Sequence, residues 1–177
     1  MAEIPLTQGM VAIVDEEDFD YLNRWRWCVS REDKREGEGN RIYYAVRGWR
    51  EGTKQKRITM HQLLIDVPKG KEIDHWDTDG LNNRRSNLRI CDHRQNIWNR
   101  RKQANTSSIY KGVSWNKRGE KWEAYIHLPD QKRKGRKRRL GLFKDEKQAA
   151  LAYNQAATSS FGKFAKLNIL LLGRTND

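Results

Sequence analysis

Short apolar stretches alternate with turn-forming residues over positions 4–65 of the chain. Four of these stretches are rich in β-branched and aromatic residues, which predicts strands at 11–14, 25–29, 42–46 and 57–60. Acidic residues at 15–18 precede Phe19 and Leu22 and predict a short helix. Charges and glycines make 31–40 a predicted mobile hairpin loop. This part of the chain shows no evident chemistry, and we interpret it as a scaffold.

The middle of the chain, residues 71–103, has the pattern of a hairpin followed by a helix. Residues 72–75 and 88–90 predict two short strands, and 77–80 predict a turn after the first of them. A helix is predicted from Asp92 to about Gln103, because Ile97 falls on an apolar face with Arg94 and Arg101 outside it.

The pattern is clearest after a short linker, which is predicted at 104–109. The predicted elements are strands at 109–115, 121–128 and 136–143, a basic turn at 129–135, a helix at 145–160 and a frayed tail from 170. Within the second strand, alternation gives an apolar face of Trp122, Ala124, Ile126 and Leu128 and a polar face of Lys121, Glu123, Tyr125 and His127. Small helix residues are expected to let the helix lie close on the sheet: Ala149, Ala152, Ala156 and Ala157.

Composition is that of a cytosolic protein. The 177 residues suffice for one large domain or two small ones, and aromatic residues, among them seven Trp, are expected to supply much of the small cores. No apolar run approaches the roughly 18 residues that span a bilayer, and the N-terminus has no secretory signal pattern. Cys28 and Cys91 are too few for a four-Cys zinc site and are expected to be reduced thiols.

Positive charge increases along the chain. The net charge is +13, of which residues 1–50 carry −2, residues 51–104 carry +5 and residues 105–177 carry +10. Such a gradient is typical of a protein that binds a polyanion and holds it mainly through its C-terminal part. Charge alone is equally compatible with a well-solvated basic surface.

Residues 74–96 contain an acid, an imidazole and carboxamides whose joint spacing suits phosphodiester hydrolysis. Asp74 offers an anionic oxygen suited to Mg²⁺, and the Asn96 carboxamide can supply a second ligand. His75 is expected on the opposite side of the strand backbone, where an imidazole with a pKa of about 6.5 suits a general base. Asn87 begins the returning strand, where its oxygen can accept the other imidazole N–H.

Taken singly, each of these residues has an ordinary structural explanation. An Asp-His pair before a Gly turn commonly caps the turn, Asn82, Asn83 and Asn87 are frequent turn formers, and Asn96 is a polar helix residue. The functional interpretation therefore depends on the combination.

That combination resembles the HNH homing endonucleases of phages and mobile introns. The matching residues are Asp74-His75, then Asn82-Asn83 and Ser86-Asn87-Leu88-Arg89, then Gln95-Asn96 and Asn99. The resemblance implies a ββα-metal fold in which Asp74 and Asn96 bind the metal, His75 is the general base and Asn87 orients it. Asn96 stands where some members have a second histidine, which points to the Asp/Asn metal-binding subtype typical of nicking enzymes. His93 is a weaker ligand candidate and is better explained as a helix-start residue.

Residues 1–70, with Met60-His61-Gln62-Leu63, resemble the N-terminal extension of phage HNH proteins more loosely.

The C-terminal part contains the segments Tyr110-Lys111-Gly112-Val113, Lys121-Trp122, Leu140-Gly141, Ala156-Ala157 and Lys166-Leu167-Asn168. With these segments it resembles the Apetala-type (ethylene-response-factor) DNA-binding domain. That family places a three-stranded sheet in the major groove with a helix behind it. The resemblance implies DNA contacts from Lys111, Ser114, Asn116, Lys121, Tyr125, His127, Lys137 and Arg139. Ser114 and Asn116 stand where arginines are usual and cannot make a bidentate Arg–guanine contact. The basic run 132–139 is expected to bind phosphates.

Together, these patterns predict an α+β protein. Residues 1–104 are expected to form a β-rich N-terminal scaffold with a ββα-metal HNH nuclease core at 71–103, and residues 105–177 a three-stranded antiparallel sheet backed by one helix. The predicted function is site-specific, metal-dependent hydrolysis of double-stranded DNA by a homing-type endonuclease that nicks, with one Mg²⁺ or Mn²⁺ per active site.

The chain is expected to act as a monomer, with no obligate protein partner and no membrane, in the cytoplasm of a bacterial or phage-infected cell. One alternative is a non-catalytic DNA-binding regulator with a degenerate nuclease fold, which the intact set of site residues disfavours. A second is an RNA-binding protein, which the C-terminal pattern disfavours.

Overall fold

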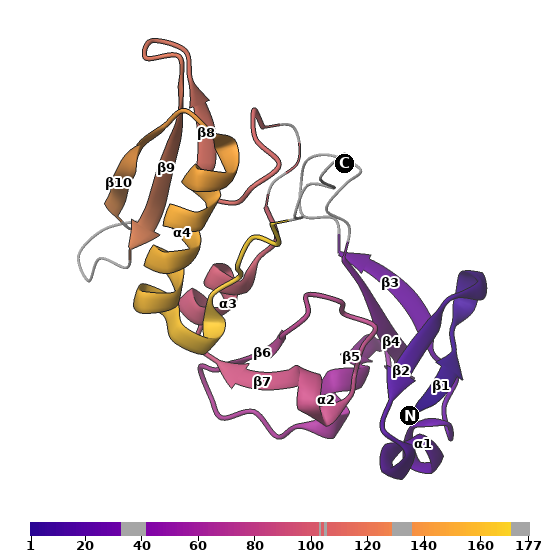
Figure 1. The fold of residues 1–177 in the computed structure, drawn as a ribbon. Coiled ribbons are helices and arrows are strands. Elements are labelled where there is room, and N and C mark those ends of the chain that lie inside the picture. The colour runs from indigo at the N-terminus through magenta and orange to yellow at the C-terminus, as the bar shows by residue number, and fades with distance from the viewer. Residues whose placement is uncertain (33–41, 103, 105, 129–135, 171–177) are drawn as a thin grey trace. The chain divides into compact units, whose positions relative to one another are not determined.

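The computed structural model describes residues 1–32, 42–102, 104, 106–128 and 136–170 (Figure 1). It divides into two compact units, Met1–Asn99 and Arg100–Asp177. The architecture is mixed α/β, with several small sheets and few helices among the described residues. Most of the predicted loop at 31–40, the basic turn at 129–135 and the tail after 170 lie outside the described residues.

The N-terminal unit begins with two small antiparallel sheets. β1 (Ala2–Pro5) pairs with β2 (Val11–Val14), and the 3-10 turn η1 (Thr7–Gly9) connects them. The second sheet has the order β3-β4-β5, formed by β3 (Cys28–Glu32), β4 (Ile42–Glu51) and β5 (Lys54–Thr59). The helix α1 (Glu16–Leu22), with acidic residues in its first turn, follows β2, and α2 (Met60–Leu64) follows β5.

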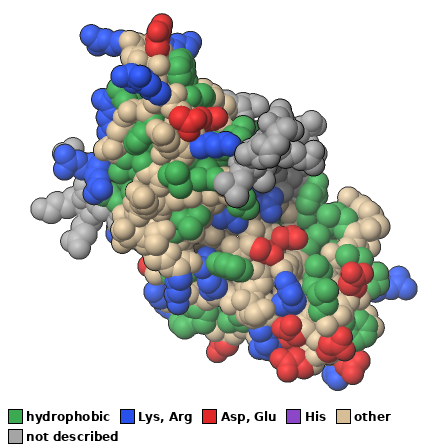
Figure 2. Space-filling model, viewed as in Figure 1, with side chains coloured by type: hydrophobic (Ala, Val, Ile, Leu, Met, Phe, Trp, Pro, Cys, Tyr) green, Lys and Arg blue, Asp and Glu red, His purple; other side chains and the backbone are tan. Residues whose placement is uncertain are grey.

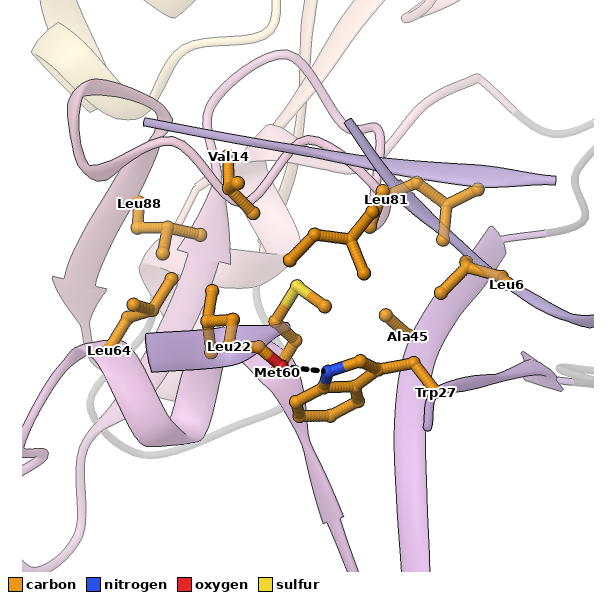
Figure 3. Packing of buried hydrophobic residues seen from close by; sticks show 11 residues of the cluster. Leu6, Val14, Leu22, Trp27, Ala45, Met60, Leu64, Leu81 and Leu88 are labelled. Carbon is orange, nitrogen blue, oxygen red and sulfur yellow. Dashed lines mark hydrogen bonds between the residues drawn. The ribbon is translucent and has the colours of Figure 1, made fainter. Parts of the chain in front are cut away.

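A hydrophobic core joins these elements (Figure 3). Leu22 and Met60 are fully buried, and the Trp27 ring lies beside them with its Nε1 donating to the Leu22 carbonyl at 2.9 Å. Leu81 and Leu88, from the segment that follows α2, belong to the same cluster. Each such buried aliphatic or aromatic side chain contributes about 1.5–3 kcal/mol. Burial of this cluster therefore stabilises strands that are too short to be stable by themselves.

The segment after α2 forms two strands and a helix. β6 (Glu72–His75) pairs antiparallel with β7 (Leu88–Cys91), which places Asp74 opposite Arg89. The 3-10 turn η3 (Arg85–Asn87) precedes β7, and α3 (His93–Asn99) follows it and lies against β6 (Figure 1). β2 holds the loop between the strands: Ile13 donates to the Leu81 carbonyl at 2.9 Å, and the Ile13 carbonyl accepts from Asn83 N–H at 2.7 Å.

Arg85 fastens this segment to the two helices of the scaffold. Its Nε and Nη2 donate to the two carboxylate oxygens of buried Asp18 in α1, at 2.8 and 2.7 Å. Its Nη1 donates to the Leu64 carbonyl at the end of α2, at 3.1 Å. A bidentate pair of this kind fixes orientation as well as distance. One guanidinium thus joins three segments that are far apart in the sequence.

The C-terminal unit is a three-stranded antiparallel sheet of order β10-β9-β8 with a long helix on one face (Figure 1). Its strands are β8 (Val113–Asn116), β9 (Lys121–Leu128) and β10 (Arg136–Phe143). The helix α4 (Glu146–Phe161) begins after Asp145, whose carboxylate accepts from Gln148 N–H at 2.9 Å, and the 3-10 turn η4 (Gly162–Phe164) ends it. Buried Ala149 and Ala150 let this helix approach Ala124 of β9.

Gly112 allows a close contact between sheet and helix. Its φ is +73°, and a Cβ atom there would lie 2.0 Å from a ring carbon of Tyr153 and 2.7 Å from the Tyr125 carbonyl. Only glycine fits this combination of positive φ and contact. Beyond the helix, Asn168 bonds both backbone groups of Lys111, at 2.7 and 3.0 Å, and so fastens the chain back onto the start of the unit.

The structure differs from the sequence prediction mainly in the scaffold. β3 begins at Cys28 and not at Trp25, because Trp27 turns into the core instead of continuing a strand. β1 and α2 were not predicted; α2 begins at Met60, where Thr59 and Gln62 form a capping box, while the prediction had a strand there. In the second segment, α3 ends at Asn99 rather than near residue 103.

Charge is distributed unevenly over the surface. Lys and Arg side chains spread over the C-terminal unit, and acidic side chains gather near α1 in the N-terminal unit (Figure 2). Among the described residues, no helix is both long and apolar enough to cross a membrane.

Candidate active site

β6 presents successive residues to opposite sides of its backbone, as strands do. Glu72 and Asp74 contact side chains of α3, whereas His75 contacts Tyr44 of β4 and His61 of α2. Asp74 and His75 are both buried, with 5% and 6% of their surface exposed. The strand therefore separates a carboxylate side from an imidazole side.

Two partners hold the Asp74 carboxylate. Arg89, opposite on β7, forms an ion pair with Oδ2 in which Nε lies at 3.0 Å, and the buried Asn99 carboxamide donates to Oδ1 at 2.9 Å. The same Asn99 nitrogen lies 2.8 Å from the His75 carbonyl and 3.3 Å from the Trp76 carbonyl. One side chain thus fastens the end of α3 to the end of β6.

Asn96, one turn earlier on α3, reaches Glu72. Its Nδ2 donates to Glu72 Oε2 at 2.6 Å, while His93 Nδ1 lies 2.8 Å from Glu72 Oε1. The sequence led us to expect Asn96 beside Asp74. In this structure Asn99, three residues further along the helix, has that place. The sequence motif contained Asn99, but nothing in the spacing distinguished it from Asn96.

The His75 imidazole lies among other rings. Its centroid is 5.0 Å from that of His61 and 5.8 Å from that of Tyr44, and its Nε2 is buried with no hydrogen-bond partner among the described residues. Burial lowers the pKa of His75, and the nearby Asn83 carboxamide and the neighbouring carboxylates offset this only in part. The ring is therefore neutral at neutral pH, which is the form a general base requires.

Asn87 closes the loop around Asp77 and makes no hydrogen bond to the imidazole among the described residues. Its Nδ2 donates to Asp77 Oδ1 at 2.9 Å and to the Asn82 carbonyl at 2.8 Å, and its Oδ1 accepts from Asp77 N–H at 3.0 Å. Burial raises the pKa of Asp77, but hydrogen bonds from Asp79, Asn82 and Asn87 outweigh it and hold this pKa below its usual value. The sequence led us to expect that Asn87 contacts the imidazole. In this structure Asn87 instead shapes the loop that follows His75.

His61 is a site residue to which sequence reasoning assigned no role. Its Nε2 lies 2.9 Å from the Thr59 hydroxyl, and its Nδ1 is buried without a hydrogen-bond partner among the described residues. Burial, and secondarily the charge of a protonated His75, lower its pKa to about 3. The Thr59-x-x-Gln62 spacing was a readable signal for the start of α2. No sequence pattern placed that helix beside β6.

The donors between β6 and α3 are of the kind that hard divalent cations bind. Glu72 and Asp74 supply carboxylate oxygens, and Asn96 and Asn99 supply carboxamides, which suits Mg²⁺ or Mn²⁺ better than zinc. In this structure the Glu72 and Asp74 carboxylates each accept hydrogen bonds from N–H donors. Their oxygens are therefore the atoms at which a cation would bind. Among the described residues, the acidic cluster with metal-ligand spacing is Asp15, Glu17 and Asp18, and Arg85 already binds Asp15 and Asp18. The carboxylate side of β6 therefore fits a cation chemically.

In the C-terminal unit, the strand residues expected to contact DNA share one face of the sheet. The register pairs Ser114 with Glu123, Asn116 with Lys121, Arg139 with Tyr125 and Lys137 with His127. This face is opposite the one on which α4 lies, because Ala124 and Ile126 between these residues are buried. Lys111 precedes β8 and is half-buried, with its Nζ donating to the Arg100 carbonyl at 2.7 Å. Burial, followed by the nearby charges of Lys166 and Arg100, lowers its pKa to about 8.

Glu123 lies in the middle of this polar face. Its carboxylate is 3.7 Å from Lys137 Nζ and 3.4 Å from Arg139 Nε. Lys137 also lies over the Tyr125 ring, 4.2 Å from its centroid. An acidic residue therefore holds two of the expected DNA-contacting cations in place and partly neutralises them.

Comparison with known proteins identifies the nuclease-like segment. Residues 66–97 match the HNH endonuclease family, and this span includes Asp74, His75, Asn87 and Asn96. The chain is 27% identical over 163 residues to L560 of Acanthamoeba polyphaga mimivirus, which is named an uncharacterized HNH endonuclease; the match covers 91% of this chain and 76% of that protein. It is 38% identical over 60 residues to protein 3.8 of Escherichia phage T7, covering 34% of this chain and 50% of the phage protein. These similarities indicate an HNH-type nuclease domain.

Asn99→Leu should destabilise the N-terminal unit by about 2–3 kcal/mol, because buried Asp74 and two backbone carbonyls lose a shared donor. Asn96→Leu, at a partly exposed position on the same helix, should cost less than about 1 kcal/mol. Urea unfolding followed by tryptophan fluorescence compares the two. Equal losses would show that Asn99 is not the residue that fastens α3 to β6.

Acid should destabilise the N-terminal unit through His61. Its folded pKa is about 3, whereas an unfolded imidazole titrates near 6.5, so below that pH the unfolded chain binds a proton that the folded chain excludes. This contribution to stability is complete above pH 6.5 and falls by about 1.4 kcal/mol for each further unit of pH down to about 3. Urea unfolding at pH 7 and pH 5 should therefore show a smaller acid-induced loss for His61→Gln than for the wild type. An identical loss in both would contradict the neutral state assigned to the half-buried His61 ring.

Proposed function

We propose that this chain is a metal-dependent DNA endonuclease whose active site is built on β6. The observation that carries this proposal is the placement of Asp74 and His75 on the two sides of one strand, within the span similar to HNH endonucleases. Hydrolysis of a phosphodiester requires a cation at the phosphate and a neutral base for the attacking water. This strand offers a carboxylate for the first and an imidazole for the second.

By the family resemblance, Asp74 and Asn96 are the proposed ligands of one Mg²⁺ or Mn²⁺, and the ββα-metal arrangement of β6, β7 and α3 is the proposed frame. In this structure Asn96 bonds Glu72 and Asn99 bonds Asp74, so Asn99 is a second candidate for the carboxamide ligand. When bound, the cation supplies positive charge at the scissile phosphate and at the departing 3′ oxygen. Arg89 forms an ion pair with Asp74 and so fixes the position of its carboxylate. Asn99 fixes the backbone at the base of the site through the His75 and Trp76 carbonyls.

His75 is the proposed general base. A water oxygen forms a bond to phosphorus, the bond from phosphorus to the 3′ oxygen breaks, and the proton of the water moves to the imidazole. The departing oxygen takes its proton from solvent, and the products carry a 5′ phosphate and a 3′ hydroxyl. Asn87 contributes by shaping the Asp77 loop, which fixes the backbone that follows His75.

The C-terminal unit is the proposed DNA-binding module, in the manner of the Apetala-type sheet. Its polar face carries Ser114, Asn116, Lys121, Tyr125, His127, Lys137 and Arg139, and Lys111 lies before it. A small nuclease unit makes few base contacts of its own. Covalent linkage to a second binding module raises the effective concentration of DNA at the active site.

The proposed enzyme is of the homing type and acts as a monomer on double-stranded DNA. One site per chain hydrolyses one bond, so a single binding event gives a nick. The viral relatives are consistent with action in the cytoplasm of a bacterial or phage-infected cell. A non-catalytic DNA-binding regulator is the competing function, and the cleavage assay below distinguishes the two.

Supercoiled plasmid that carries the sequence flanking the gene should be converted to the nicked circle by the wild-type chain with Mg²⁺, and EDTA should stop the conversion. His75→Ala and Asp74→Asn should each lower the nicking rate by at least about 100-fold, since each removes a group required for the chemical step. Asp66→Asn, an exposed aspartate on the approach to β6, is the matched control and should cleave like the wild type.

Two outcomes would count against this assignment. Wild-type protein that binds the DNA but does not nick it would favour the regulator. Nicking by His75→Ala at the wild-type rate would show that another residue is the base.

The affinity for DNA should depend on salt through the polar face of the C-terminal sheet. Lys137→Ala and Arg139→Ala should each weaken binding and reduce the slope of log affinity against log salt by about 1. Glu123→Gln should tighten binding, because it removes the anion that partly neutralises both cations. Lys147→Ala, on α4 behind the sheet, removes one charge away from that face and is the control. Fluorescence anisotropy at several salt concentrations measures all four; a slope changed only by Lys147→Ala would place the DNA on the helix side.

A further inference from the structure

The His75 ring has an unexpected neighbour in His61. The two imidazoles come from β6 and α2, their centroids lie 5.0 Å apart, and their planes meet at 82°. Tyr44 of β4 contacts both rings, at 5.6 Å from His61 and 5.8 Å from His75. Three aromatic side chains from three elements therefore form one cluster that includes the proposed base, with His61 edge-to-face to both Tyr44 and His75.

Thr59 holds the His61 ring by a hydrogen bond. The Thr59 hydroxyl lies 2.9 Å from His61 Nε2, and the Thr59 backbone N–H donates to Gln62 Oε1 at 3.0 Å at the start of α2. The hydroxyl therefore comes from a residue whose own backbone is fixed by the helix cap. This hydrogen bond fixes the rotation of the His61 ring about its side-chain bonds. A contact between apolar groups is not directional and would not fix it.

An imidazole at position 61 is a costly choice for packing alone. Its Nδ1 is buried with no hydrogen-bond partner among the described residues. Leaving a buried polar atom unpaired lowers the stability of the fold, and an apolar ring avoids that cost. A phenylalanine would therefore serve stability as well or better, so the imidazole is better explained by function.

The orientation of His75 also lacks the support that the sequence led us to expect. The Asn87 carboxamide is used by Asp77 and Asn82, and His75 Nε2 has no partner among the described residues. The ring is therefore held by the nearby Asn83 carboxamide and by the aromatic side chains that pack against it. Of these, His61 is the one whose rotation is fixed by a hydrogen bond to a helix cap.

We propose that His61 is a positioning residue, which together with the Thr59 hydroxyl holds the His75 ring in the orientation that accepts a proton from water. The proposal rests on the assignment of His75 as the base. His61 itself touches no reacting atom; it acts through the ring of His75. A ring turned away from the attacking water loses catalysis steeply, because proton transfer requires the two atoms to be within hydrogen-bond reach.

His61→Phe tests this role, because it keeps a ring and removes the bond to Thr59. The turnover number for plasmid nicking should fall by roughly 10- to 100-fold, while the affinity for DNA stays within about twofold. The midpoint of urea unfolding should be equal to or higher than that of the wild type. Met60→Leu, the adjacent residue of α2 that faces the core, is the control and should keep its turnover.

Thr59 gives an independent test of the same contact. Thr59→Val removes the hydroxyl and should lower turnover as His61→Phe does, whereas Thr59→Ser retains the hydroxyl and should keep it. The double variant Thr59→Val/His61→Phe should turn over, per folded molecule, no more slowly than either single variant, because both remove the Thr59–His61 hydrogen bond. Thr59→Val also removes the side-chain cap of α2, which lowers stability and is measured separately by urea unfolding. Fully additive losses would mean that the two residues act separately and would overturn the proposal.

The imidazole nitrogen resonances of His75 provide a readout that does not require cleavage. In ¹⁵N-labelled wild-type protein without DNA, these resonances should report one dominant tautomer of His75. In the His61→Phe variant they should report a mixture of the two tautomers. Unchanged resonances, or a turnover per folded molecule within twofold of the wild type, would refute the positioning role. If the wild type nicks no DNA at all, the proposed function fails, and these resonances still decide whether His61 orients His75.

Discussion

Two backbone hydrogen bonds between β2 and the loop at 81–83 are the constraint on which the candidate site depends. They join Ile13 to Leu81 and Asn83, and Leu81 is at the same time buried in the scaffold core. These bonds pair the backbone N–H and C=O of Ile13 at the edge of a short sheet, and they fix the backbone of the loop. From that path Asn82 reaches Asp77, and Asp77 in turn binds Asn87. The arrangement after His75 therefore exists only once the first strands of the chain have folded.

This dependence changes the role of the N-terminal segment, which its sequence presented as a passive scaffold. β4 and α2 supply Tyr44 and His61, which surround the proposed base. Gly80 lets the loop cross β4 closely, since a Cβ atom there would lie 2.4 Å from the Tyr43 carbonyl and 2.6 Å from the Tyr44 ring. The scaffold thus supplies one side of the site, and the segment similar to HNH endonucleases supplies the other.

Sequence reasoning succeeded where a pattern is local and failed where a contact joins distant segments. Alternation in 121–128 predicted the two faces of β9, and the small residues of α4 predicted its approach to the sheet. The spacing of Asp74 and His75 likewise predicted two sides of one strand. Asn87 bonds Asp77 and the Asn82 carbonyl in this structure, because short polar side chains satisfy nearby backbone and loop groups first. His61 could not be found because no period or motif records which helix packs beside β6.

The strand β6 separates a charged side from an uncharged side, which explains how the adjacent residues Asp74 and His75 can have such different surroundings. In the proposed mechanism Asp74 acts as a carboxylate and is paired here with Arg89, whereas His75 acts as a neutral base and is buried among rings. On a helix, successive residues lie about 100° apart and would share more of one environment, but on a strand they are separated by the backbone. A phosphate that reaches both groups must therefore approach where the strand ends. His75 is the last residue of β6, and Trp76, 61% exposed, follows it. The end of this strand is accordingly the place where, in the proposed function, the carboxylate and the imidazole act on one bond.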